Sequence, residues 1–426
     1  MTATLAEQII ARAAGRDRVA PGEIVTCRVD LAMMHDSGGP RRIAPILEDL
    51  GCTVWDRDKV VVVTDHFVPA VDAESAAIGK LTRDWVAGAG IKRFHDMEGI
   101  CHVVLPEYGL LRPGMFVAGG DSHSTTGGAF GCFMFGVGAT DMAAILATGE
   151  TWIRVPGTMR IEWSGRVGSG VCAKDMMLLA CGRLGMGAAR NRVVEFTGPA
   201  VRTLAMDERM TLCNMAAELG AMSGMIAADE ITAQALRDAG VAADEIRAGD
   251  DGSGARPAPD VSFDAGDLVP QVAAPHSPAN AGDVAGHAGT AVNQAYIGAC
   301  TGAKLDDLRM AARVLEGRRV APGVRLLVAP ASTRITAAAA ADGILAILSE
   351  AGAKLLPSGC GACAGFGAGV LADGETCIAT TARNFKGRMG APGSRVYLAS
   401  PYTVAASAVA GVIADPRPML EGAADA

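Results

Sequence analysis

Two cysteines near the C-terminal end have a spacing that is found in metal sites and in redox-active dithiols. Cys360 and Cys363 form a Cys-x-x-Cys pair flanked by glycines in the stretch LLPSGCGACAGFGAGVLADG. A redox dithiol usually follows an early strand and has aromatic and proline neighbours, whereas this pair lies late in the chain. A closed zinc site needs four ligands, and the sequence has no second Cys-x-x-Cys pair. The pair alone does not decide between these sites and an iron–sulfur centre.

A third cysteine, Cys300, ends another apolar run in YIGACTGAK and is followed by a small polar loop. Full ligation of an iron–sulfur cluster takes four cysteines. A cradle of only three thiolates would leave one iron free to bind a substrate as a Lewis acid. The spacing leaves this hypothesis open against the alternative of three unrelated cysteines, because free cysteine is most often a buried apolar residue.

Histidines and carboxylates also follow several apolar runs. They are Asp65 and His66 in TDHFVPA, His102 in ICHVVLPEYG, Asp121, Ser122 and His123 in GGDSHSTTGG, and Glu195 in RVVEFTG. A carboxylate holds an imidazole in one tautomer and raises its pKa, which makes the imidazole a competent proton donor. Arg383 and Arg388 in ARNFKGRMG are cations suited to bidentate binding of carboxylates. Each residue alone has a structural alternative, but together they indicate a catalytic site.

The elements that must position these residues follow an α/β pattern. Short β-branched or apolar runs precede the polar loops, in DKVVVVTDH, GMFVAGGDSH, QAYIGAC, VRLLVAPAS and ETCIATTARN. The repeated order of buried strand, glycine-rich or polar loop and helix predicts parallel sheets. Ligand groups gather at the carboxyl ends of such strands, so we expect the polar loops to converge.

One segment interrupts this rhythm. Residues 248–284 are rich in Pro, Gly and Asp and have little periodicity, which predicts a linker or an extended crossing. We therefore expect two closely packed α/β domains in residues 1–285 and a third α/β domain, with the three cysteines, in residues 286–426.

Composition excludes several classes of protein. The 426 residues carry 38 basic and 46 acidic side chains, a net charge of -8, and no basic stripe that would bind nucleic acid. The N-terminal residues predict a surface helix and not a signal peptide, and no apolar run reaches the roughly 20 residues of a membrane span. Eleven cysteines without an export signal make a disulfide framework improbable. We expect a cytoplasmic protein with no membrane or nucleic-acid partner.

Seven ordered motifs carry a resemblance over nearly the whole chain. TDHFVPA, GGDSHSTTGG, VEFTGPAV, PHSPAN, YIGACTG, GCGACAG and TARNFKGRMG together resemble the aconitase superfamily. In length and order the chain is most similar to the separate large subunits of 3-isopropylmalate dehydratase and homoaconitase-type hydro-lyases. The resemblance implies three α/β domains around one [4Fe-4S] cluster bound by Cys300, Cys360 and Cys363, without the family's swivelling fourth domain.

The resemblance also implies roles for the polar residues. His66, paired with Asp65, would protonate the departing hydroxyl of a 2-hydroxy di- or tricarboxylate. The pairs His102 with Asp121 and His123 with Glu195 would orient ligands of the open iron. Arg383 and Arg388 would bind substrate carboxylates or help to position the cluster. The loop MMHDSGGPRR would bring His35 and Asp36 towards the substrate, with a structural role for this pair as the alternative.

The family's proton-abstracting serine belongs to the swivelling domain, so the resemblance implies a separate small subunit that carries this base. Two family motifs depart from their usual form. Residues 299–302 read Ala-Cys-Thr-Gly in place of Ser-Cys-Thr-Asn, and residues 381–384 read Thr-Ala-Arg-Asn in place of Ser-Asn-Arg-Asn. The loss of an asparagine at Gly302 and at Ala382 removes amide hydrogen bonds near the expected cluster.

The resemblance favours 3-isopropylmalate dehydration and rehydration in leucine biosynthesis. The alternatives within the family are homoaconitase and dehydratases of citramalate or 2,3-dimethylmalate. A non-catalytic iron sensor that binds RNA is an alternative from another class, which the net charge of -8 argues against.

Overall fold

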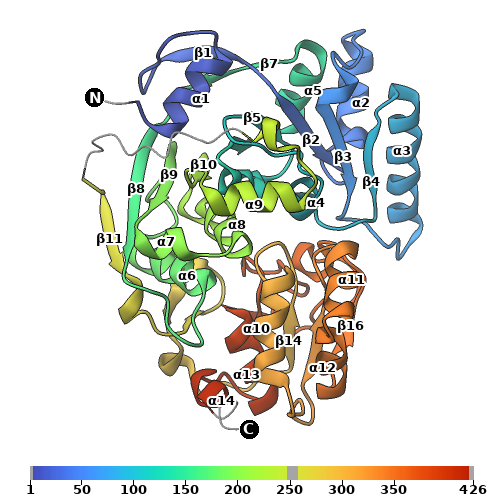
Figure 1. Ribbon diagram of the computed structural model, residues 1–426. Helices are drawn as coiled ribbons and strands as arrows, with labels where there is room; N and C mark the ends of the chain where they lie inside the picture. Colours follow the sequence, from blue (N-terminus) through green and yellow to red (C-terminus); the bar gives the residue numbers. More distant parts are fainter. Residues whose placement is uncertain (1–2, 247–257, 422–426) are drawn as a thin grey trace.

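The computed structural model describes residues 3–246 and 258–421, and three larger sheets organise them (Figure 1). The first sheet has the strand order β4-β3-β2-β5-β6 and is parallel throughout. Its strands are β2 (Leu31–His35), β3 (Val60–Thr64), β4 (Arg93–Asp96), β5 (Phe116–Gly119) and β6 (Phe133–Gly136). Its helices are α2 (Pro40–Asp49), α3 (Ala73–Ala89), α4 (Cys101–Glu107) and α5 (Ala139–Thr148), and the 3₁₀ segment η2 (Ser122–Phe130) follows β5.

The second sheet has the order β10-β9-β8-β11 and is also parallel. It consists of β8 (Gly157–Ser164), β9 (Arg192–Thr197), β10 (Ser223–Met225) and β11 (Val261–Asp264). With it come α6 (Ala173–Leu184), α7 (Pro199–Thr203), α8 (Met206–Met215), the 3₁₀ turn η3 (Ala216–Leu219) and α9 (Glu230–Asp238). A small antiparallel pair, β1 (Ile24–Arg28) and β7 (Glu150–Arg154), lies near the N-terminal helix α1 (Leu5–Ala13).

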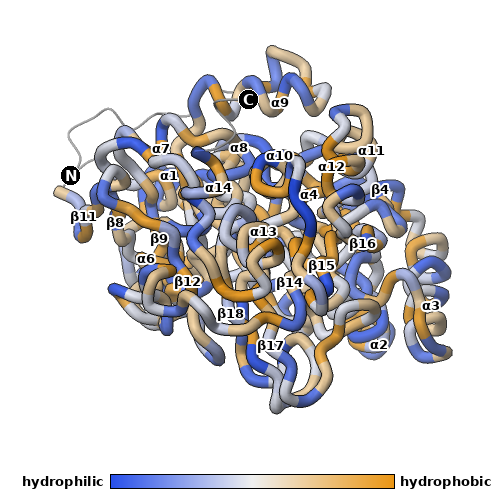
Figure 2. Tube along the Cα trace, turned by 90° about the horizontal axis from the view of Figure 1, so that it is seen from below, coloured by the Kyte–Doolittle hydropathy of each residue, from blue (hydrophilic) through white to orange (hydrophobic). Residues whose placement is uncertain are grey.

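The third sheet has the order β13-β12-β18-β17-β14-β15-β16. Its strands are β12 (Gln271–Ala273), β13 (Ala281–Asp283), β14 (Gln294–Ile297), β15 (Arg325–Val328), β16 (Lys354–Leu355), β17 (Thr376–Ala379) and β18 (Arg395–Ala399). Its helices are α10 (Leu305–Leu315), α11 (Thr333–Ala341), α12 (Ile344–Ala351), α13 (Pro401–Ala410) and α14 (Arg417–Glu421). Figure 2 views this part of the molecule from below, with β14, β15, β17 and β18 near one another.

The predicted strands are confirmed. The five apolar runs form β3, β5, β14, β15 and β17, and every residue of β3 is buried. A Val-rich run without alternation suits such a strand, because helices or neighbouring units cover both faces of a parallel sheet. We call each of the three larger sheets, together with its helices, the first, second and third unit. A continuous core that includes Val61, Trp163 and Val328 joins one face of the first sheet to the second and third units.

The segment expected to be a linker has more structure than its composition suggested. Residues 247–257 lie outside the described part, but the remainder forms β11, β12 and β13. β12 pairs antiparallel with both β13 and β18. The third sheet therefore extends back to Gln271, before the division expected between residues 285 and 286. Within the described residues, no helix combines the length and apolar character needed to cross a membrane.

Candidate active site

The carboxyl ends of strands from two sheets face each other across a cavity of about 430 Å³. The first unit contributes His35 at the end of β2, His66 after β3, and Asp121 and Ser122 after β5. The third unit contributes Arg383 and Arg388 from the loop after β17. The apolar part of the lining comes from Met34, Ile43, Phe67, Val137, Met142 and Phe366. The polar loops thus converge as the sequence predicts.

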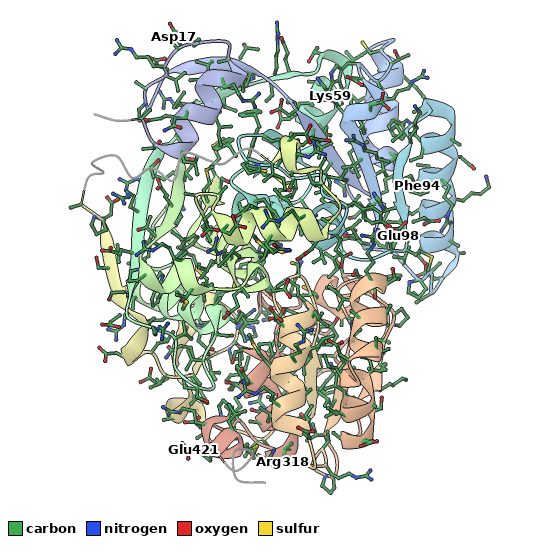
Figure 3. The ribbon with its side chains drawn as sticks, in the orientation of Figure 1. Asp17, Lys59, Phe94, Glu98, Arg318 and Glu421 are labelled. Atoms are coloured by element: carbon green, nitrogen blue, oxygen red, sulfur yellow. The ribbon has the colours of Figure 1, made fainter. Side chains whose placement is uncertain are left out.

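Backbone contacts fix the third unit against the first beside this cavity. The amide of Ile100 donates to the carbonyl of Ala331 at 2.9 Å, and the amide of Cys360 donates to the carbonyl of Asp65 at 2.8 Å. The carbonyl of Glu98 also accepts from the amide of Thr333. In Figure 3, Glu98 lies at the border between the first unit, above, and the third unit, below. The cysteine loop is therefore held directly against the loop of Asp65 and His66.

Asp65 and His66 form a tight acid–base pair. Nδ1 of His66 lies 2.6 Å from Oδ1 of Asp65, and Oδ2 of Asp65 accepts from the amide of Cys101 at 2.8 Å. Burial disfavours the imidazolium, but the adjacent Asp65 carboxylate outweighs it and raises the pKa of His66 to about 9. Burial likewise opposes the carboxylate, but His66 lowers the pKa of Asp65 to about 2. His66 therefore carries a proton at neutral pH and faces the cavity.

Asp36 and His35 differ in their position relative to the cavity. Asp36 is fully buried, and its carboxylate accepts from the amides of His66 at 3.0 Å and Phe67 at 2.8 Å. It therefore supports the His66 loop and does not line the cavity, which corrects the expectation that it contacts substrate. His35 does line the cavity, with Nε2 2.9 Å from the carbonyl of Gly120. Burial and then the nearby charge of His66 lower the pKa of His35, so this ring is neutral.

Asp121 contacts two more of the predicted histidines, His102 and His123. Nε2 of His102 lies 2.8 Å from Oδ1 of Asp121, and the amide of His123 donates to the same oxygen at 2.7 Å. Burial favours the neutral acid, yet the hydrogen bonds from His102 and His123 hold the pKa of Asp121 well below its usual value. Nδ1 of His102 is buried and has no partner among the described residues. The expected pairing of His102 with Asp121 is confirmed as a contact.

The carboxylate that pairs with His123 is Glu218, and the expected pairing with Glu195 is wrong. Nε2 of His123 lies 3.0 Å from Oε1 of Glu218. Glu195 is an interior residue of β9, opposite Met225 of β10 and Arg160 of β8, and so belongs to the second sheet. Glu218 follows α8, which packs against η2 and so faces the histidine. The available signal was an acidic residue inside the apolar run CNMAAELGAM.

Glu218 also orders the arginine that faces the cavity. Nε of Arg383 donates to Oε1 of Glu218 at 2.8 Å, and Nη1 of Arg383 donates to Oγ of Ser122 at 2.9 Å. Burial opposes protonation of His123, but Asp121 and Glu218 raise its pKa. This network joins all three units, because Ser122, Glu218 and Arg383 come from different parts of the chain.

The three predicted cysteines are brought together behind this network. Each of the eleven cysteines, all within the described residues, is unpaired. Burial and then the neighbouring Cys363 and Asp121 charges raise the pKa of Cys300 to about 12. Burial also raises the pKa of Cys360 well above its usual value, with contributions from Asp65, Cys363 and Cys300. The charge of Cys363 acts on both Cys300 and Cys360, so the three thiols lie near one another.

Polar donors surround the three sulfurs. Nδ2 of Asn214 donates to Sγ of Cys300 at 3.1 Å, a contact that the motifs alone did not reveal. Burial raises the pKa of the Cys363 thiol, and the Arg388 cation beside it counteracts the rise. Ala299, just before Cys300, has a φ of 67°, a left-handed conformation that a non-glycine residue seldom adopts outside functional sites.

Lys174 is a further residue that sequence reasoning missed. It is 1% exposed, and its ammonium donates to the carbonyls of Thr380 at 2.8 Å and Thr381 at 2.6 Å and to Oγ1 of Thr301 at 3.2 Å. Among the described residues, no carboxylate forms an ion pair with it. Burial lowers the pKa of Lys174 to about 8, while the thiolates of Cys300 and other nearby groups oppose the shift. A buried cation therefore lies behind the cysteine cradle.

The structure also explains one departure from the family motif. A Cβ at Gly302 would lie 2.1 Å from the Cβ of Thr380, so no side chain fits at this position. The hydroxyl of Thr380 accepts from the amide of Gly298 at 2.9 Å and donates to the carbonyl of Gly298 at 2.8 Å. Thr380 therefore takes up space that an asparagine at residue 302 would need.

Buried acid–base pairs, free thiols and arginines at the ends of parallel strands define an α/β enzyme whose cavity suits carboxylate substrates. The chain belongs to the aconitase family: the model of the "Aconitase family (aconitate hydratase)" matches residues 7–291 and 285–411. Membership of this family makes the chain a hydro-lyase.

Curated relatives match along their full length. The 3-isopropylmalate dehydratase large subunit 1 of Methanopyrus kandleri is 47% identical over 99% of this chain and 100% of its own. The methanogen homoaconitase large subunit of Methanocaldococcus jannaschii is 45% identical over 96% of this chain and 99% of its own. Among solved structures, the aconitase X of Thermococcus kodakaraensis shares the fold, with a TM-score of 0.50, 15% identity, and coverage of 90% of this chain and 94% of that one.

Proposed function

We propose that this chain is the large, cluster-binding subunit of a hydro-lyase that removes and re-adds water across adjacent carbons of a 2-hydroxy di- or tricarboxylate, with 3-isopropylmalate as the first candidate. One observation carries the proposal. A protonated His66 and two arginines line a single cavity, and the three cysteine thiols gather beside the Asp65–His66 pair, with Sγ of Cys360 4.0 Å from Oδ2 of Asp65. This set combines a proton donor, carboxylate-binding cations and soft metal ligands.

The residues present fit a [4Fe-4S] cluster. Cys300, Cys360 and Cys363 supply three soft donors, and because burial raises the pKa of each thiol, they would give up their protons to solvent when a cation takes their place. Lys174 and Asn214 add a positive charge and an N–H donor next to the sulfurs. When bound, the cluster would supply a Lewis-acidic iron that polarises the hydroxyl of the substrate.

The residues of this chain then have separate tasks. His66 holds a proton on the cavity side of the Asp65 pair and delivers it to the departing hydroxyl. Arg383 and Arg388 bind substrate carboxylates, and Glu218 together with Ser122 fixes the orientation of Arg383. His102, whose ring contacts Asp121, and His123, whose ring contacts Glu218, would orient ligands of the open iron. The serine base that abstracts the proton from carbon is expected on a separate small subunit, in keeping with the large-subunit names of the relatives.

The cavity wall bears on the choice of substrate. Met34, Ile43, Val137 and Met142 form an apolar side that suits a branched alkyl group. Arg42 lines the same cavity, is exposed, and has no side-chain partner among the described residues. Arg42 could bind the additional carboxylate of a tricarboxylate substrate. A homoaconitase-type tricarboxylate is therefore the second candidate.

The test begins with the chain reconstituted anaerobically with iron and sulfide and combined with a candidate small subunit. We expect about four irons per chain, loss of the cluster in Cys363→Ser, and turnover of 3-isopropylmalate that requires both subunits. Preferential turnover of homocitrate would select the second candidate. A reconstituted parent chain that holds no cluster under these conditions would refute the proposal.

A further inference from the structure

Tyr296 carries a buried hydroxyl without a partner. It lies in β14, four residues before Cys300, and its side chain is fully buried. Among the described residues, no group forms a hydrogen bond with its hydroxyl oxygen. Leaving a buried hydroxyl unsatisfied lowers the stability of the folded chain. Buried polar groups of this kind call for an explanation, such as a ligand that is bound in the active protein.

The hydroxyl lies where the two cysteine-bearing loops meet. A Cβ on Gly298, two residues before Cys300, would lie 2.6 Å from the hydroxyl oxygen. A Cβ on Gly361, between Cys360 and Cys363, would lie 3.7 Å from the same oxygen. Both positions are glycine, so the tyrosine approaches the backbone of both loops closely. The charged forms of Cys363 and Cys360 are close enough to oppose ionisation of the phenol.

The neighbouring cavity offers no alternative partner. It has a volume of about 180 Å³, and besides Tyr296 itself its lining consists of apolar side chains and glycines, including Val68, Leu356 and Phe366. An ordered water needs two to four polar partners, and these side chains supply none. The side chains whose charge acts on the phenol are Cys363, Cys360 and Cys377, and the first two belong to the cysteine cradle.

We infer that the Tyr296 hydroxyl donates a hydrogen bond to a sulfur atom of the bound iron–sulfur cluster, either a cysteine thiolate or an inorganic sulfide. The inference rests on the proposed cluster and makes Tyr296 a positioning residue that tunes it. A hydrogen bond to a cluster sulfur stabilises the reduced form and so raises the reduction potential. It also strengthens retention of iron, since loss of an outer-shell partner typically weakens metal affinity about 10-fold or more.

The test compares Tyr296→Phe with the parent chain, both without and with the cluster. This variant keeps the ring and removes only the oxygen. Without the cluster, the variant should melt at a higher temperature than the parent, because an unpartnered buried hydroxyl has been removed. With the cluster, that gain should vanish or reverse, the reduction potential should shift to more negative values, and iron loss under mild oxidation should accelerate about 10-fold. In the parent, pulsed electron paramagnetic resonance should detect a proton coupling at the cluster that is lost after transfer to D₂O. Tyr296→Phe should lack this exchangeable coupling.

Tyr402→Phe is the matched control. Tyr402 is also a buried tyrosine of the third unit, but its hydroxyl accepts from Arg313 at 3.3 Å. This variant should leave the potential and the proton coupling unchanged and should not melt higher in the cluster-free form. The inference is overturned if the parent chain takes up the cluster and Tyr296→Phe matches it in potential, proton coupling and melting difference. Failure of the parent to take up any cluster would instead overturn the proposed function.

Discussion

The rings of His35 and His66 stack with their centroids 4.2 Å apart and an interplanar angle of 18°. A carboxylate oxygen lies 2.6 Å from the ring of His66, whereas an oxygen of Asp121 lies 3.9 Å from the ring of His35, which contacts the carbonyl of Gly120 instead. One ring is therefore charged and its neighbour is neutral. This asymmetry assigns the proton to the histidine that we propose as the acid.

The first prediction concerns this proton. The activity of the assembled enzyme should fall as the pH rises through about 9, where His66 loses its proton. Asp65→Asn removes the charge that raises this pKa, so the basic limb of the kcat/KM profile should move to lower pH. His66→Gln should lower kcat by about 100-fold or more. A basic limb that stays in place in Asp65→Asn would assign the proton to another group.

The second prediction compares the contributions of Glu218 and Glu195 to catalysis. Glu218→Gln should lower kcat by about 100-fold, because the carboxylate charge that holds His123 and Arg383 is lost. Glu195→Gln should leave kcat within about threefold of the parent, because this residue belongs to the sheet of β9. Both variants should first be shown to contain the same amount of iron. Equal losses of activity in the two variants would contradict the assignment of Glu218.

The third prediction concerns the buried cation. Without a cluster, Lys174→Met should raise the melting temperature, because a buried charge with no carboxylate partner is costly. The same variant should hold the cluster about 10-fold more weakly, measured as iron lost to a chelator. Lys304→Met is the control: Lys304 is also buried, but it pairs with Asp307 at 2.7 Å, so its removal should destabilise the cluster-free chain.

The fourth prediction uses a carboxyl where the first and third units meet. Oγ of Ser332 donates to Oε1 of Glu107 at 2.6 Å. Burial raises the pKa of Glu107 from its ordinary 4.5 to about 7, although Ser332 and Arg334 oppose the shift. The folded chain therefore holds this proton more tightly than the unfolded chain. The stability from this group is full below pH 4.5 and is lost as the pH rises through about 7.

Glu107→Gln keeps the acceptor for Ser332 without the charge. It should therefore melt about 2 °C higher than the parent at pH 8, with the difference shrinking towards pH 5. Glu48→Gln on α2 changes an exposed carboxylate and should show no such trend. A pH-independent difference for Glu107→Gln would indicate a packing effect instead.

The sequence predicted the strands and the convergence of their loops because parallel strands buried on both faces leave unbroken apolar runs, such as the one in β3. The three cysteines and the adjacent Asp65 and His66 could be picked out from short, dense motifs, whereas the pairing of His102 with Asp121 came from the family resemblance. The partner of His123 was missed because Glu218 reaches it through the packing of α8 on η2, which no local spacing encodes. Lys174 and Asn214 were missed for the same reason: their contacts with the cysteine loops are long-range.

The strand β12 has a consequence for how the chain is made. Its Val272 and Ala273 pair with Ala399 and Leu398 of β18, near the end of the chain, while the amide of Gln271 donates to Asp175 of α6 at 2.8 Å. During synthesis, β12 is made before β18, so it can dock on α6 while the edge that pairs with β18 is still open. Nascent chains that stop before Arg395 would expose this edge to aggregation or to chaperones. The cysteines of the cradle thus lie between two strands, β12 and β18, that pair with each other only after all three cysteines have been translated.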